Sequence, residues 1–263
     1  DSRFHLRHGG KMAIVVIDAI GDYVTKKLNN PEIKILFAKR WPGYLVFIYE
    51  FLPASSGPDA RLSGSFKSGI YDRDQRQVSR NGIGFTIKTT YNLSEFDTIS
   101  YETDLLLDSL KILKDKTLNS VLVFNPGQGY IPVMLCKATD AKKIYLVDRD
   151  MQALTLSKEN LLSNGCQANT IATSHQVGIS IKSEGPFDGI VGILDEDDSS
   201  TVHALYLREA ADQLSTEGVI IAAASSTAVT RLESLLHKEK FLRIVDRKRS
   251  KGRSVLIMKR KVK

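Results

Sequence analysis

The pattern of apolar residues becomes regular after Tyr91 and stays so to the end of the chain. Short runs of consecutive apolar residues alternate there with segments whose apolar residues recur at helical spacing. Strands buried on both faces of a sheet form such runs, and their alternation with helices indicates βαβ units. The predicted strands cover residues 120–124, 143–147, 169–172, 189–193, 218–223, 242–246 and 254–259. The predicted helices cover residues 102–114, 131–138, 151–164, 200–214 and 228–238.

These elements predict an α/β fold with a mainly parallel sheet and helices on both of its faces. The last two strands are an exception, because only the short basic segment 247–253 (RKRSKGR) joins them. A connection of this length makes a hairpin, so one of these two strands runs antiparallel to the others.

The first part of the chain has short apolar runs separated by turn-rich stretches. Residues 12–17 and 44–51 predict strands, residues 34–38 a weaker strand, and residues 18–28 a helix. These elements predict a small α+β domain that precedes the α/β domain.

Residues 53–84 are rich in Ser, Gly, Asp and Arg and show almost no periodicity. We expect a long loop or irregular structure at a domain boundary there. The prediction is therefore an N-terminal domain of residues 1–88 and a second domain of residues 89–263. Residues 1–11 precede the first methionine, Met12, and we expect them to be a vector-derived tag or a flexible terminus.

The overall composition is that of an ordinary globular protein, with 42% apolar and 25% charged residues. No apolar stretch approaches the roughly 18 to 20 residues that a membrane span needs. Cys136 and Cys166 stand far apart in the sequence and belong to no Cys/His cluster. This spacing favours a reducing compartment, which we take to be the cytoplasm, and argues against a structural zinc ion.

The segment 121–133 (VLVFNPGQGYIPV) joins a predicted strand to a predicted helix through a glycine-containing turn. Gly127 and Gly129 allow backbone N–H groups to approach a ligand closely. Asp148 stands at the end of the next strand, where a carboxylate is placed to accept both hydroxyls of an adenosine ribose. The combination predicts a nucleoside-binding site. The alternative is a tight turn with a solvated Asp148.

The turn does not match two common nucleotide-binding motifs. A dinucleotide fingerprint has a third small residue three positions after Gly129, where this chain has Pro132. A P-loop requires Gly-Lys followed by Ser or Thr, which is not present. A Pro-Gly-x-Gly turn at this position is compatible with S-adenosylmethionine.

From about Thr89 onward the sequence resembles the small-methyltransferase superfamily, and within it the ribosomal RNA guanine-N2 methyltransferases. Residues 92–110 are similar to the family's aromatic-containing stretch, glycine-plus-Thr/Ser turn and Leu-rich helix. Residues 125–129 (NPGQG) stand at its cofactor loop and Asp148 at its ribose acid. Residues 159–165 (ENLLSNG) and 187–191 (FDGIV) resemble a helix end and the fourth strand.

The resemblance implies a Rossmann-like methyltransferase fold and S-adenosylmethionine as the cofactor. The cofactor-binding residues it implies are Thr103, Asn125, Pro126, Gly127, Gly129, Asp148, Arg149 and His175.

The chain departs from the family's pattern at the site of the methyl acceptor. Positions 193–196 are Ile, Leu, Asp and Glu, where the family has an Asn-Pro-Pro-aromatic motif that binds an exocyclic amine and stacks its base. A leucine side chain accepts no hydrogen bond. Asp195 either replaces the lost acceptor or belongs to a solvated acidic loop, residues 195–198.

The net charge of +7 is concentrated at the end of the chain. Residues 237–263 contain twelve Lys and Arg residues and two acids. The segment 247–253 leaves the carboxyl end of its strand, the edge where parallel sheets bind ligands. The residues expected to contact RNA phosphates are Arg247, Lys248, Arg249, Lys251 and Arg253. The alternative is a solvated basic tail.

These observations predict an S-adenosylmethionine-dependent methyltransferase that acts on a base in ribosomal or transfer RNA. Methyl transfer depends mainly on holding donor and acceptor in the geometry of attack, so it needs few catalytic side chains. An alternative is a non-catalytic RNA-binding protein built on the same fold, which the missing acceptor motif favours. A methyltransferase for a small molecule or a protein is a third possibility, which the basic segment argues against.

Overall fold

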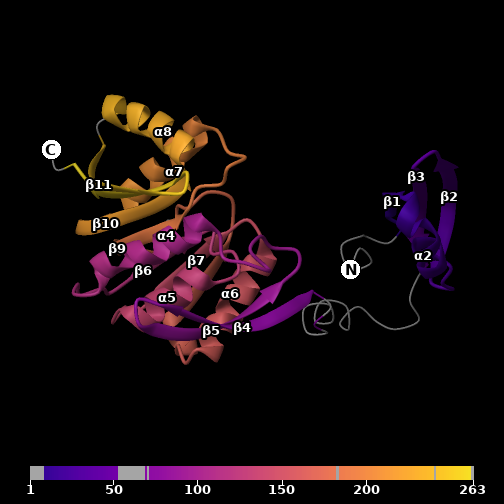
Figure 1. Cartoon of the computed structure of the whole chain (residues 1–263), viewed down its shortest axis with the longest axis horizontal. Coiled ribbons are helices and arrows are strands. Elements are labelled where there is room, and N and C mark those ends of the chain that lie inside the picture. Colours follow the sequence, from indigo (N-terminus) through magenta and orange to yellow (C-terminus); the bar gives the residue numbers. More distant parts are fainter. Residues whose placement is uncertain (1–8, 53–68, 70, 182–183, 240, 262–263) are drawn as a thin grey trace. The chain divides into compact units, whose positions relative to one another are not determined.

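The computed structural model describes residues 9–52, 69, 71–181, 184–239 and 241–261. The chain forms two compact units, Asp1–Ile70 and Tyr71–Lys263 (Figure 1). The division between the units falls between residues 70 and 71, whereas the boundary predicted from the sequence falls between residues 88 and 89.

The first unit is a three-stranded antiparallel sheet with one helix. Its elements are β1 (Lys11–Ile17), α2 (Asp18–Leu28), β2 (Ile33–Trp41) and β3 (Tyr44–Phe51), and β3 lies between the other strands. The predicted helix and strands are confirmed, although β2 is longer than expected. One face of the sheet packs against α2 around Leu28, Leu45, Phe47 and Tyr49.

The second unit contains a seven-stranded sheet with the order β11-β12-β10-β9-β6-β7-β8. The strands β8, β7, β6, β9 and β10 are parallel, and β12 runs antiparallel to both of its neighbours. The predicted α/β fold with an antiparallel terminal hairpin is therefore confirmed. The strands are β6 (Val121–Phe124), β7 (Ile144–Asp148), β8 (Ile171–His175), β9 (Phe187–Ile193), β10 (Leu214–Ser225), β11 (Leu242–Ser250) and β12 (Arg253–Arg260).

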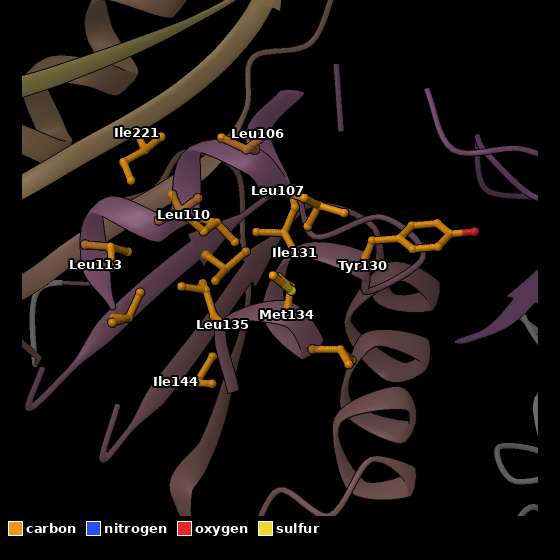
Figure 2. Packing of buried hydrophobic residues seen from close by; sticks show 14 of the residues in the cluster. Leu106, Leu107, Leu110, Leu113, Tyr130, Ile131, Met134, Leu135, Ile144 and Ile221 are labelled. Carbon is orange, nitrogen blue, oxygen red and sulfur yellow. The ribbon is translucent and has the colours of Figure 1, made fainter. Parts of the chain in front are cut away.

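Helices cover both faces of this sheet. One layer contains α4 (Tyr101–Ser109), α5 (Tyr130–Ala138) and α6 (Met151–Ser163), and the other contains α7 (Ser200–Gln213) and α8 (Ser226–Glu239). Successive residues of a strand point to opposite faces, so Val121 and Val123 of β6 pack under the first layer, and Leu122 and Phe124 under the second. Burial on both faces explains why the strands are continuously apolar. Figure 2 shows leucines of α4 packed with Ile131 and Leu135 of α5.

The structure contains one hairpin that the sequence analysis assigns to irregular structure. β4 (Asp72–Arg80) and β5 (Ile83–Thr90) pair antiparallel through Asn81 and Gly82, which both have positive φ. An Asn-Gly pair is the common choice for such a two-residue turn. β4 was missed because its sequence, DRDQRQVSR, is polar and mostly exposed. Val78, Phe85 and Ile87 nevertheless join the core of the second unit. Residues 53–68 of the expected loop lie outside the described residues.

Two other expectations about elements need correction. The predicted helix 102–114 is α4 followed by a 3₁₀ turn, Leu110–Leu113. Residues 247–250 of the basic segment belong to β11, so the turn itself consists of Lys251 and Gly252. Alternation along β11 therefore separates the basic side chains between the two faces of the strand.

The cysteines also differ from the expectation of a reducing compartment. Cys136 near the end of α5 and Cys166 after α6 form a disulfide, with a Cα–Cα distance of 6.5 Å. The two helices pack side by side, which brings together residues that are 30 positions apart in the sequence. Within the described residues, no helix is long and apolar enough to cross a membrane.

Candidate active site

A cavity of about 530 Å³ lies at the carboxyl ends of the parallel strands. The sheet order reverses at β6, whose neighbours β7 and β9 continue the chain in opposite directions. Open α/β sheets bind their ligands at such a reversal. The cavity is lined by residues 92–95, 100, 102, 103, 125–127, 130, 131, 148–150, 153 and 193–197.

The loop after β6 forms the centre of this cavity. Gly127 has a φ of +54°, and a Cβ at this position would meet no described atom within 4 Å, so the backbone here is open to a ligand. Asn125 also has positive φ, and its side chain donates a 2.8 Å hydrogen bond to the carbonyl of Ile193. The loop thus fixes the segment after β9 as well as its own turn. Pro126 lines the same wall.

Gly129 has a different role from Gly127. It begins α5 with a φ of +93°, and a Cβ there would stand 3.1 Å from the Cα of Ser157 in α6. Gly129 is not among the described residues that line the cavity. Its lack of a side chain allows α5 and α6 to pack closely below the loop.

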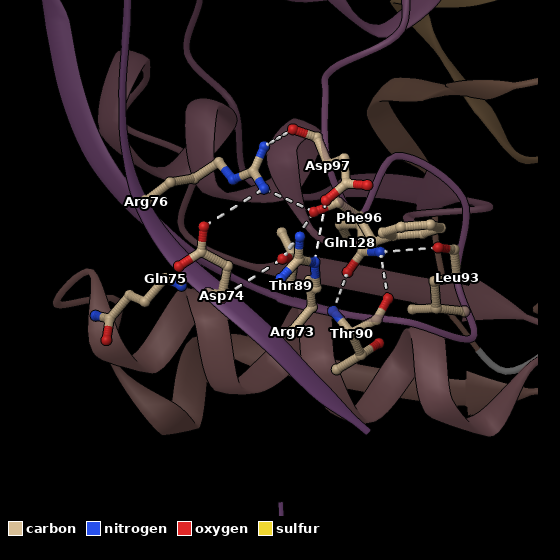
Figure 3. Close-up of polar contacts among 10 residues, drawn as sticks. All are labelled: Arg73, Asp74, Gln75, Arg76, Thr89, Thr90, Leu93, Phe96, Asp97 and Gln128. Carbon is tan, nitrogen blue, oxygen red and sulfur yellow. Dashed lines mark hydrogen bonds and ion pairs between the residues drawn. The ribbon is translucent and has the colours of Figure 1, made fainter. Parts of the chain in front are cut away.

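Gln128 connects the loop to the segment that follows β5. Its side chain is buried, and its Oε1 accepts a 3.0 Å hydrogen bond from the backbone N–H of Thr90. Its Nε2 lies 3.0 and 3.1 Å from the carbonyls of Thr90 and Leu93 (Figure 3), and 2.9 Å from the carbonyl of Ser94. One buried amide thus holds residues 92–95 against the cavity. The sequence analysis missed this role, because a glutamine in a glycine loop has no distinctive spacing.

Two asparagines of the ENLLSNG segment bind the β5 backbone in the manner of a neighbouring strand. Asn160 accepts from the N–H of Lys88 at 2.9 Å and donates to its carbonyl at 2.8 Å. Asn160 also donates to the carbonyl of Gln128 at 2.8 Å. Asn164 pairs with Thr86 in the same way, at 3.0 and 2.7 Å. The hairpin, α6 and the loop are therefore one hydrogen-bonded assembly.

Asp148 lies at the end of β7 and is only 8% exposed. Its carboxylate accepts a 2.8 Å hydrogen bond from the backbone N–H of Asp150. Burial raises the pKa of Asp148 to about 6, against the opposing effect of that hydrogen bond. The free capacity of this carboxylate suits hydroxyl donors of a ligand.

The residues beside Asp148 are partly engaged in other contacts. Arg149 forms a 2.9 Å ion pair with Asp195 across the cavity mouth. The Nε2 of His175 lies 3.0 Å from the carbonyl oxygen of Arg149, but His175 is not among the described lining residues. We call residues 148–150 the Asp148 end of the cavity.

The opposite end of the cavity is formed by Glu102, Glu196 and their partner Arg253, which we call the Glu102 end. Arg253 pairs with Glu102 at 3.2 Å and also with Glu196. Glu102 is 7% exposed, and its Oε1 has no hydrogen-bond partner within the described part of the chain. Burial raises the pKa of Glu102, and Arg253 opposes this shift.

Thr103 and Tyr130 line the space between the two ends. The hydroxyl of Thr103 donates to Glu95 Oε1 at 2.7 Å, and Glu95 also accepts from the N–H of Ser100 at 3.0 Å. Tyr130 points away from the leucine cluster (Figure 2), and its buried hydroxyl is unpartnered among the residues described. Burial raises the pKa of this hydroxyl. Free buried polar atoms and an open glycine turn are what a nucleoside with a polar tail requires.

The terminal hairpin reaches this cavity at the Glu102 end. Ser225, at the carboxyl end of β10, is paired with Arg253, and Lys251 Nζ lies 4.1 Å from the centroid of the Tyr101 ring. Arg247 is engaged elsewhere, because it pairs with Glu233 and donates to Ser226 at 3.2 Å. Lys248 is half-buried and Arg249 is exposed, and neither forms an ion pair within the described part of the molecule. The five basic residues are thus in different environments.

The fold and the cavity define the class of the protein, a Rossmann-like methyltransferase that binds S-adenosylmethionine. The chain belongs to the methyltransferase small domain family, which matches residues 85–250. It is therefore an S-adenosylmethionine-dependent methyltransferase by family. A comparison with curated proteins finds no match.

Solved structures similar to this chain are methyltransferases of the same fold. The T. thermophilus 16S rRNA N2 G methyltransferase RsmC, in complex with AdoMet and guanosine, is 18% identical, with a TM-score of 0.64 over 97% of this chain and 66% of its own. A ribosomal protein L11 methylase from Lactobacillus delbrueckii subsp. bulgaricus is 20% identical, with a TM-score of 0.53 over 61% and 79%. A putative methyltransferase from Streptococcus mutans is 14% identical, with a TM-score of 0.54 over 81% and 58%. The chain thus spans about two thirds of the RsmC chain.

Proposed function

We propose that this protein methylates a base in ribosomal or transfer RNA. The observation that carries the proposal is the meeting of the basic hairpin and the cofactor cavity, through the contacts of Arg253 with Glu102 and Glu196. A polyanion bound along the hairpin would have its neighbouring base at the mouth of the cavity. The likeness to an RNA methyltransferase supports the same substrate class. We expect the protein to act in the cytoplasm because its proposed RNA substrates are there, and this expectation does not rest on the cysteines, which form a disulfide.

The residues of the cavity bind and orient. Asp148 would accept hydrogen bonds from the ribose hydroxyls of the cofactor, and the open backbone from Asn125 to Gly127 would also hold it. Arg149, Thr103 and His175 are the remaining cofactor-binding residues that we propose, with Gly129 acting through the packing of α5 and α6. The cofactor supplies an electrophilic methyl group on a sulfonium. The protein contributes by excluding water and aligning the acceptor.

The basic hairpin contributes affinity for RNA. We propose Lys248, Arg249 and Lys251 as phosphate contacts, with Arg247 holding the hairpin to α8 and Arg253 holding it to the cavity. This division follows from the ion pairs that Arg247 and Arg253 already make.

A second candidate function is RNA binding without catalysis. The residues at positions 194 and 195, where the resembled family has its acceptor motif, favour this alternative. Leu194 is 1% exposed, and Asp195 is paired with Arg149, so neither is free to receive an amine.

The test combines cofactor binding with methyl transfer. Calorimetric titration with S-adenosylmethionine measures binding to the wild type and to Asp148→Ala. Transfer of a labelled methyl group to unmodified ribosomal and transfer RNA transcripts then measures turnover. Binding and turnover together support the proposal. Cofactor binding without turnover on any RNA supports the non-catalytic alternative, and turnover on RNA-free extract contradicts an RNA substrate.

A further inference from the structure

Glu102 occupies an unusual position for a carboxylate in the first turn of a helix. Ser100 caps α4 by accepting from the N–H of Thr103 at 3.1 Å, so the helix end is satisfied without Glu102. Acids in a first turn are normally solvated, whereas the Glu102 side chain is only 9% exposed. Its burial therefore calls for an explanation beyond helix stability.

The two oxygens of Glu102 differ in their environment. Arg253 lies against Oε2, at 3.2 Å, while Oε1 is buried with no partner among the described residues. A buried acceptor without a donor is unfavourable, and such groups are often completed by a ligand. Glu102 also lines the cavity, so a ligand there contacts this side chain and reaches Oε1 through a rotation of the carboxylate.

The position of Glu102 across the sheet indicates which ligand group it meets. Its partner Arg253 begins β12, whereas Asp148 ends β7. Four strand-to-strand steps separate β7 from β12 in the sheet order, which is roughly 19 Å at a strand spacing of about 4.8 Å. With the ribose at Asp148, Glu102 lies on the β12 side of the cavity, which residues 193–197 also line and where the resembled family has its acceptor motif.

The other groups near that segment are already engaged. The carbonyl of Ile193 accepts from Asn125, the carboxylate of Asp195 pairs with Arg149, and Glu196 shares Arg253. Oε1 of Glu102 is the buried carboxylate oxygen left free among the described residues. A carboxylate oxygen accepts hydrogen bonds, so its ligand must present a donor.

We propose that Glu102 is the specificity-determining residue for the methyl acceptor, its Oε1 receiving the exocyclic N–H of an amino-bearing base while Arg253 holds Oε2. This inference rests on the proposed function in RNA. It gives the acceptor pocket a hydrogen-bond acceptor from α4 in place of the absent motif after β9. The substrate class is accordingly a base with an exocyclic amine, namely guanine, adenine or cytosine.

The test uses nucleosides that differ at the amine. Calorimetry on the protein saturated with S-adenosylhomocysteine compares guanosine with inosine, adenosine with purine riboside, and cytidine with uridine. We expect the wild type to prefer the amino-bearing member of one pair by about tenfold, which is the effect of one hydrogen bond to a charged group. Glu102→Ala removes this preference, and Glu102→Gln retains part of it through its amide oxygen.

The matched control is Glu217→Ala, since Glu217 is an exposed acid of the same sheet that pairs with Lys259 at 3.4 Å. It should keep the wild-type preference. Equal binding within every pair, no nucleoside binding, or a preference that survives Glu102→Ala would each overturn the inference. Glu102→Gln preserves the shape of the side chain and provides the test if the alanine variant does not fold.

Binding of S-adenosylhomocysteine, measured on the same samples, separates this inference from the proposed function. If the protein binds the cofactor and methylates RNA but shows no preference for amino-bearing nucleosides, only the proposed role of Glu102 is wrong. Failure of the wild type to bind the cofactor would remove the proposed function itself.

Discussion

The two ends of the cavity are built in different ways. The Asp148 end is formed by the tips of adjacent parallel strands and by a glycine turn, all within residues 121–150. The Glu102 end joins a helix start, the loop after β9 and the first residue of β12, which are far apart in the sequence. Local chain geometry therefore builds the proposed cofactor site, whereas long-range ion pairs build the proposed acceptor site. Substitutions can separate the two.

The largest effect is expected from Gln128, which holds residues 92–95 against the cavity. Gln128→Leu removes one accepted hydrogen bond and the two N–H donors that three backbone carbonyls share. We expect the free energy of unfolding to fall by about 3 kcal/mol, because backbone groups of Thr90 and Leu93 lose buried partners. Denaturant titration measures this change.

Gln152→Leu is the matched control for this prediction. Gln152 is also buried and makes one hydrogen bond to the same segment, to the Thr90 hydroxyl at 2.9 Å. Its loss should cost about 1 kcal/mol. Equal destabilisation by the two variants would contradict the role given to Gln128.

Asp148→Ala should damage the Asp148 end alone. We expect about a 100-fold loss of S-adenosylmethionine affinity, corresponding to about 2.7 kcal/mol for two hydrogen bonds to a carboxylate. Affinity for RNA should be unchanged, since the hairpin contacts lie at the other end. Calorimetry measures both, and Asp212→Ala, in an exposed acid of α7, serves as a control. A parallel loss of RNA affinity would show that the ends are not independent.

The difference between the two ends of the cavity also explains which strands and site residues could be predicted from the sequence. The parallel strands were predictable because burial on both faces requires continuous apolar runs, and Asp148 because it directly follows one of them. β4 was missed because only Val78 of its nine residues is buried. Glu102 carries no signal in the sequence, because an acid in the first turn of a helix is normally a solvated residue. Its burial and its pairing with Arg253 depend on packing between distant segments, as does the disulfide of Cys136 with Cys166.

The pH dependence of cofactor binding tests whether Asp148 is ionised in the complex with the cofactor. With a pKa of about 6, Asp148 is roughly one-tenth ionised at pH 5. We expect S-adenosylmethionine affinity to fall about tenfold, or about 1.4 kcal/mol, between pH 7 and pH 5, because the protonated carboxyl accepts hydrogen bonds less well. Asp148→Asn should flatten this profile. An unchanged wild-type profile would contradict an ionised Asp148 in the complex.

Protein stability should respond to pH in the opposite direction. The folded-state pKa of Asp148 lies above its ordinary value of 3.8, so the native state binds this proton more tightly than the unfolded chain. The contribution of Asp148 to the free energy of unfolding therefore falls as the pH rises from about 4 to about 6. Comparing wild type with Asp148→Asn in thermal unfolding at several pH values isolates this contribution.

The smallest effect is expected from the hairpin side chains that the fold does not use. Lys248→Ala with Arg249→Ala should weaken RNA binding several-fold and lower the slope of log affinity against log salt by about 1.4 to 1.8, as for two lost phosphate contacts. Cofactor affinity should not change.

Arg247→Ala should instead lower protein stability, because the Arg247 side chain is 11% exposed and pairs with Glu233. Lys111→Ala with Lys114→Ala removes the same charge just before β6, at the amino end of that strand, and should leave the RNA salt slope as in the wild type. If both double variants changed the slope equally, the effect would reflect net charge, and the hairpin would have no special part in RNA binding.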